Sequence, residues 1–131
     1  MDILAYEYLK QGLKNYNDKI GKPRGNVVVS YPTKDTTYPH TVFDEIRNVE
    51  NLVAQKVAST GYRVDIYAKT KGKIDKQIIA REIAQEVNKY LTSQNLRRIS
   101  FNASPQVNDD SIYQITMTYA GNLYEIRRKF I

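Results

Sequence analysis

Apolar side chains recur at helical spacing in two segments of the chain. Near the N-terminus they follow one another at intervals of three and four residues, on one face of a helix: Ile3, Tyr6, Leu9, Leu13, Tyr16 and Ile20. Gly12 interrupts this segment and weakens the helix by about 1 kcal/mol relative to alanine. Gly21 and Pro23 predict where the helix ends.

The second helical segment follows Asp75, which is a typical N-cap residue. An apolar stripe predicts its packed face: Ile78, Ile79, Ile83, Val87, Tyr90 and Leu91. Polar side chains occupy most of the opposite face, which we expect to be exposed to solvent: Arg81, Glu82, Gln85, Glu86 and Lys89.

Between and after the helices, β-branched and alternating segments predict strands over residues 26–31, 40–46, 58–68, 96–104, 113–119 and 123–127. Alternation in the third strand predicts one buried face, and one wet face formed by Arg63, Asp65 and Tyr67. Residues 120–122 contain a glycine and predict the turn of a C-terminal hairpin.

Strands that are joined by short turns pair antiparallel, so this order of elements predicts an α+β fold. We expect a single domain over residues 1–131. Its mainly antiparallel sheet carries the long helix and the N-terminal helix on one face. A chain of this length can bury one hydrophobic core without disulfides, and it contains no cysteine.

Charge is unevenly distributed along the chain. The net charge is +6, with 9 basic and 8 acidic residues in 1–65 against 11 and 6 in 66–131. A basic half is typical of a nucleic-acid surface, of a surface for an acidic protein partner, or of a surface that only maintains solubility. The chain has no apolar run of a length near 18 residues and no signal-peptide pattern, which predicts no membrane association.

Residue types that support catalysis are sparse. His40 is the one histidine, and without cysteine it cannot complete a zinc site. Asp44 and Glu45 are neighbours on a predicted strand and point to opposite faces, while the Asp109–Asp110 pair is typical of a turn. We therefore predict no enzymatic activity, no catalytic residue, no metal and no cofactor.

Eleven tyrosines favour an interaction surface, because tyrosine supplies amphipathic contact area. Stacking on nucleic acid would require basic and aromatic side chains on one strand face. Arg97, Arg98, Ile99 and Phe101 satisfy that pattern only loosely. Sequence-specific binding to nucleic acid is the weaker hypothesis.

Several segments taken in order resemble a known family. They are Tyr38-Pro39-His40-Thr41-Val42-Phe43, then Tyr62 to Ala68, then Ile79-Ala80 and Ile83-Ala84 in the long helix, and last Leu96-Arg97-Arg98, Pro105 and Ile112 to Gly121. In order and spacing they resemble the tail completion proteins of long-tailed bacteriophages, also called tail terminators or tail-to-head joining proteins. The Gly-Phe pair that the family usually has before the arginine is Asn95-Leu96 here.

The resemblance implies a structural virion protein without catalysis. Family members form a ring, typically of six copies, that closes the head-proximal end of the tail tube and presents a surface to the head connector. Its implied partners are other copies of itself, the tail tube protein and the head-closure or connector protein, with DNA only passing through the lumen. The implied location is the virion neck, and the host cytoplasm during assembly. The alternative is a small basic binding module for nucleic acid or an acidic protein.

Two segments are predicted to form the ring or neck interface. The first is the polar turn after the third strand, with Lys69, Lys71 and Lys73, or the neighbouring loop over residues 47–60. The second is the C-terminus, where basic residues precede two apolar residues that are poorly suited to a free tail: Arg127, Arg128, Lys129, Phe130 and Ile131. The alternative for this segment is a solvated tail.

Overall fold

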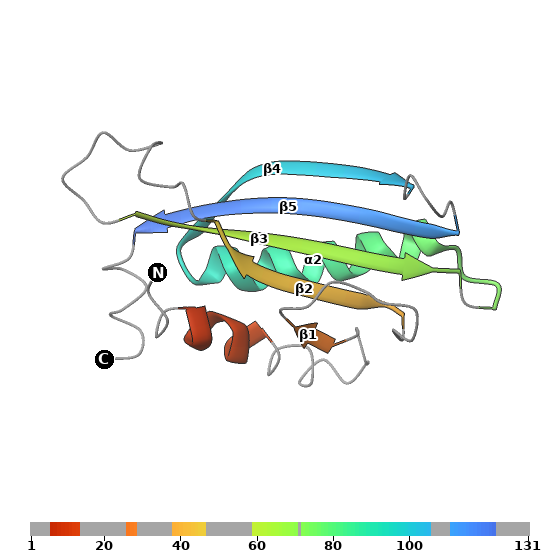
Figure 1. Ribbon diagram of the computed structural model, residues 1–131, viewed down its shortest axis with the longest axis horizontal. Coiled ribbons are helices and arrows are strands. Elements are labelled where there is room, and N and C mark those ends of the chain that lie inside the picture. Colours follow the sequence, from red (N-terminus) through yellow and green to blue (C-terminus); the bar gives the residue numbers. More distant parts are fainter. Residues whose placement is uncertain are drawn as a thin grey trace.

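The computed structural model describes residues 6–13, 26–28, 38–46, 59–70, 72–105 and 111–122. Residues 6–13 are helical. The elements that follow are β1 (Asn26–Val28), β2 (His40–Glu45), β3 (Ser59–Lys69), α2 (Lys76–Ser93), β4 (Leu96–Pro105) and β5 (Ile112–Asn122). They form one small α+β domain, as predicted (Figure 1).

The strands form one sheet in the order β1-β2-β3-β5-β4. All neighbours pair antiparallel except β1, which pairs parallel with β2. The predicted turn at residues 120–122 is wrong, because β5 continues through Asn122. Gly121 pairs with Thr60 on one side and Leu96 on the other, so two flanking strands hold it extended. The strand predicted over 123–127 lies outside the described residues.

The hydrophobic core lies between the sheet and the helices, and α2 runs along one face of the sheet (Figure 1). β3 contributes Val64 and Ile66, which are fully buried as their alternation predicts. The helical residues 6–13 contribute Tyr6, which stacks on Phe43 at 5.4 Å between ring centroids. Its hydroxyl also donates a hydrogen bond of 2.6 Å to the Phe43 carbonyl. Both helices therefore bury their apolar faces in one core.

Gly12 has a packing role in this core. A Cβ atom at this position would overlap the Tyr90 side chain of α2. The missing side chain allows the ring to approach the backbone of residues 6–13, which offsets the low helix propensity of glycine.

The two ends of α2 follow local rules. Asp75 is the N-cap, and its side chain accepts a hydrogen bond from the Gln77 amide. At the other end, Asn95 adopts φ 66°, the left-handed conformation that commonly ends a helix. The chain then enters β4 at Leu96, which is buried.

One residue of the predicted α2 stripe is misplaced. Ile78 is 53% exposed, so the prediction that it belongs to the core face is wrong. The face is instead completed by small residues, Ala80 and Ala84, next to Ile83 and Val87. At 100° per residue, Ile78 points almost directly away from Ala80, whereas Ala84 points the same way as Ala80 within one turn.

The second face of the sheet differs from the prediction as well. Asp65 is 1% exposed and Tyr67 is also buried, although the alternation predicted that both face water. The Asp65 carboxylate is stabilised by hydrogen bonds from Arg63, Gln114 and Thr116, the shortest being 2.6 Å from the Thr116 hydroxyl. Burial of this charge is possible because β3 itself and the neighbouring strand β5 supply the donors.

Candidate functional site

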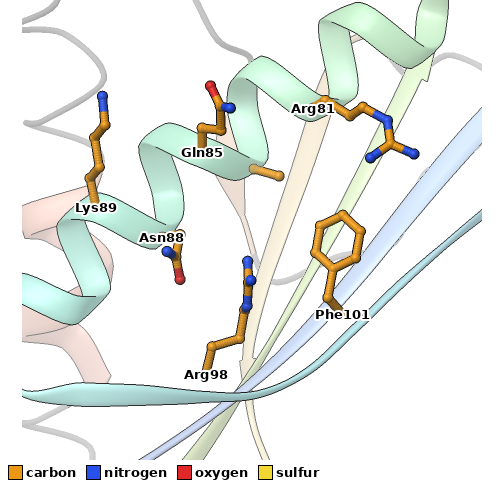
Figure 2. A pocket seen from close by; sticks show the side chains of 7 residues that line it. Arg81, Gln85, Asn88, Lys89, Arg98 and Phe101 are labelled. Carbon is orange, nitrogen blue, oxygen red and sulfur yellow. The ribbon is translucent and has the colours of Figure 1, made fainter.

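A groove runs between α2 and β4, at the open edge of the sheet. Its volume is about 550 Å³, and its lining is formed by Arg81, Ala84, Gln85, Asn88, Lys89, Arg98 and Phe101. Figure 2 shows Arg98 and Phe101 extending from β4 toward α2, with Arg81 and Asn88 extending from α2 toward them. Gln85 and Lys89 point outward from the same helix. Two guanidinium groups and one aromatic ring therefore converge in the groove.

A β-bulge determines which side chains of β4 face this groove. The register with β5 shifts between Arg98 and Ser100, so that Ile99 is an extra residue. Arg98 pairs with Tyr119 and Phe101 with Met117, and both partners are on the core face of β5. Without the bulge, residues three apart in a strand would point to opposite faces. The bulge therefore places Arg98 and Phe101 together.

Contacts inside the groove hold its side chains in position. The Arg98 guanidinium lies over the Phe101 ring, 5.2 Å from its centroid. Tyr119 donates a hydrogen bond of 2.8 Å from its hydroxyl to the Asn88 side-chain oxygen. Arg81 donates a hydrogen bond of 3.5 Å to the Tyr113 hydroxyl. Two buried tyrosines of β5 therefore support the wall of the groove, and both arginines contact a neighbouring side chain.

The electrostatics of the groove favour anions. Burial raises the pKa of Tyr119 to about 12, and the neighbouring Arg98 acts in the opposite direction. The hydroxyl therefore stays neutral at physiological pH and adds no negative charge beneath Arg98. Lys89 lies 3.5 Å from Glu86, which is not among the lining residues. The ionisable groups that line the groove are all cationic, so the site can bind carboxylate or phosphate groups.

The sequence does not predict this groove. It predicts Arg81 and Lys89 on a helix face that is exposed to solvent, and the three-residue spacing of Arg98 and Phe101 predicts opposite faces of a regular strand. The β-bulge at Ile99 compensates for this spacing and places both side chains on one face. A bulge has no reliable signal in one sequence, and the meeting of α2 with β4 is a tertiary event.

The predicted interface residues are described only in part. Lys69 ends β3, is exposed, and places its ammonium 4.7 Å from the centroid of the Tyr38 ring. Lys73 is exposed in the turn before α2. Residues 59–60 of the predicted loop belong instead to β3, where they pair with β5. Lys71, residues 47–58 and the C-terminal segment Arg127, Arg128, Lys129, Phe130 and Ile131 lie outside the described residues. The structure therefore places two of the predicted residues at the same end of the sheet.

An exposed apolar pair, which the sequence did not predict, lies directly beside this turn. Ile74 follows Lys73, and Ile78 lies in the first turn of α2. Both side chains are more than half exposed. Ile74 and Ile78 therefore add exposed apolar area next to an exposed lysine at this end of the domain.

In the described part of the chain, no three His, Asp or Glu side chains are grouped closely enough to hold a metal ion. No helix in the same ranges has the length and apolar character required to cross a bilayer. The sequence matches no protein-family model and no curated protein.

Proposed function

We propose that the protein is a structural component of a long-tailed phage virion, a tail completion protein. In this proposal, copies of the chain form a ring, of six by resemblance, on the head-proximal end of the tail tube. The ring ends tube growth and offers its other side to the head-closure or connector protein. DNA only passes through its lumen.

The observation that carries the proposal is the exposure of apolar side chains beside cations on two different elements. Ile74 and Ile78 lie beside Lys73 at the start of α2, and Ile99 lies beside Arg98 on the edge strand β4. Neighbours in a closed ring use two different surfaces of each subunit, because the contact is head to tail. A subunit with exposed apolar side chains at two separate places fits that requirement.

The departure from the family pattern at Asn95-Leu96 is conformationally conservative. Asn95 has φ 66°, a conformation for which glycine is the usual residue and asparagine the common substitute. Leu96 is buried, so this position takes an apolar side chain, as it does in the family. The resemblance is therefore compatible with the backbone at this point.

The C-terminal segment is a further proposed contact. Arg127, Arg128 and Lys129 would meet acidic groups of a neighbouring subunit, and Phe130 and Ile131 would dock as apolar anchors. Deletion of residues 130–131 should then weaken joining of tails to heads at least as much as Arg127→Ala combined with Arg128→Ala. A silent deletion, combined with tight and salt-sensitive binding of the intact chain to DNA, would contradict this role.

Gene deletion in the phage that encodes the chain tests the function. We expect tails of uncontrolled length and filled heads without tails, both visible by negative-stain electron microscopy. Wild-type protein supplied in trans should restore normal particles. Ile74→Asp combined with Ile78→Asp should not restore them, whereas Gln77→Asp, an exposed position of the same helix turn, should.

Normal tails and normal joining in the deletion strain would contradict the proposal. Full complementation by the double isoleucine variant would remove the start of α2 from the interface.

A further inference from the structure

We infer that the groove between α2 and β4 is a binding site for an acidic segment of a different protein. The site is defined by Arg81, Asn88, Arg98 and Phe101, with Gln85 and Lys89 on its outer rim. The inference rests on this geometry and not on the phage assignment, so each can fail without the other.

The chemistry of the lining identifies the ligand as an anion with several charged groups. Three of the side chains are cations, and the two amides can donate hydrogen bonds. Arginine binds planar carboxylates through two parallel hydrogen bonds. Arg98 is held against Phe101 and Arg81 toward Tyr113, so little side-chain freedom is lost when a ligand binds.

A different protein is a better source of this ligand than a second copy of the chain. Each acidic side chain in the described ranges already interacts within its own chain: Glu7, Asp44, Glu45, Asp65, Asp75, Glu82 and Glu86. The chain also carries a net charge of +6, which attracts an acidic partner at long range.

A protein ligand is also favoured over nucleic acid. Proteins that bind single strands without sequence preference stack successive bases on several aromatic side chains. This groove has one ring, which is 37% exposed and carries the Arg98 guanidinium over one face. Its volume of about 550 Å³ fits a few amino-acid side chains and does not form a continuous track for a phosphate backbone.

The experiment is a titration of the full-length protein with a short peptide of alternating glutamate and serine, followed by NMR of the backbone amides. We expect chemical-shift changes in α2 residues 81–89 and β4 residues 97–103, and none with a peptide in which glutamine replaces glutamate. Changes spread over all basic surfaces, or no changes, would overturn the inference.

Variants then locate the contact by fluorescence anisotropy of the labelled peptide. Arg98→Ala should weaken binding about tenfold or more, because it removes hydrogen bonds to a charged group. Arg97→Ala is the matched control: this neighbour pairs with Ala120 and points to the other face of the sheet, so binding should change less than about twofold. Arg98→Lys keeps the charge and should lose most of the affinity through the lost two-pronged geometry.

Three results would overturn the inference. Equal losses in Arg97→Ala and Arg98→Ala would indicate nonspecific attraction. Tighter binding of oligothymidylate than of a peptide of matched charge would identify a nucleic-acid site. Loss of self-association in Arg98→Ala, without any binding of the peptide, would identify a second copy as the occupant.

Discussion

Replacing Asp65 by alanine tests the least expected feature of the fold, a buried carboxylate on the second face of the sheet. Asp65 is 1% exposed, and its oxygens accept hydrogen bonds from Arg63, Gln114 and Thr116. Asp65→Ala removes the shared acceptor from the middle of β3 and leaves these donors without it. We expect a large loss of stability without a change of fold.

The magnitude follows from the exposure of the donors. Leaving a buried hydrogen-bond donor without its acceptor costs about 1–3 kcal/mol. The Arg63 side chain is 45% exposed and can regain water, so the loss comes mainly from Gln114 and Thr116 and amounts to about 3 kcal/mol. For a domain of 131 residues, an unfolding entropy of about 2.1 cal/mol/K per residue converts this cost into a fall in Tm of roughly 10 °C.

Thermal and urea unfolding followed by circular dichroism measure this difference. Asp75→Ala is the matched control, because Asp75 is an exposed N-cap whose loss costs about 1 kcal/mol. If Asp65→Ala is no more destabilising than Asp75→Ala, then the carboxylate is hydrated and the second face of the sheet is open to solvent at this point.

Further predictions concern the core, alkaline pH and the interface. Ile83→Asp should abolish the cooperative thermal transition because it buries an unpaired charge, whereas the exposed Ile78→Asp should melt near the wild-type temperature. Similar melting temperatures of the two variants would show that the faces of α2 are misassigned. Burial raises the pKa of Tyr6, Tyr90 and Tyr119 from 10 to about 12, so the native state keeps protons that the unfolded state loses. The stability that these groups contribute should be complete below pH 10 and fall between pH 10 and 12. Constant urea midpoints over that interval would contradict the burial of the three tyrosines. Replacing Lys69, Lys71 and Lys73 together by glutamate should leave a folded monomer but give tails that fail to join heads. Normal infectious particles from this variant would exclude these lysines from the interface.

Periodicity correctly predicted the residues of β3 that face the core under the helices. Val64 and Ile66 are buried there, as their alternation along the strand requires. Asp75 marked the start of α2 correctly, since capping depends only on the residues next to it. Local rules succeed at these positions because local chemistry determines the structure there.

Predictions failed where a neighbouring strand decides the outcome. Gly121 was expected in a turn, but pairing with Thr60 and Leu96 keeps it in β5. Asp65 was expected in water, but donors from β5 satisfy its charge inside the protein. The pairing partners of Gly121 and the β5 donors to Asp65 are all distant in sequence, so no local pattern predicts these contacts.

The candidate site was missed for a related reason. Arg98 and Phe101 share a face only because Ile99 bulges out of the ladder. Their partners Arg81 and Asn88 come from a helix that reads as amphipathic with a solvent-exposed polar side. Of the predicted interface, Lys73 lies in the turn before α2 as expected, whereas Lys69 was expected in that turn and is the last residue of β3, paired with Ile112.

Cryo-electron microscopy of the virion neck tests the proposed function most directly. We predict a ring of this α+β domain between the last ring of the tail tube and the connector, with the start of α2 contacting a neighbouring copy. A neck map in which another protein occupies that position, with this chain absent from the particle, would contradict the proposal.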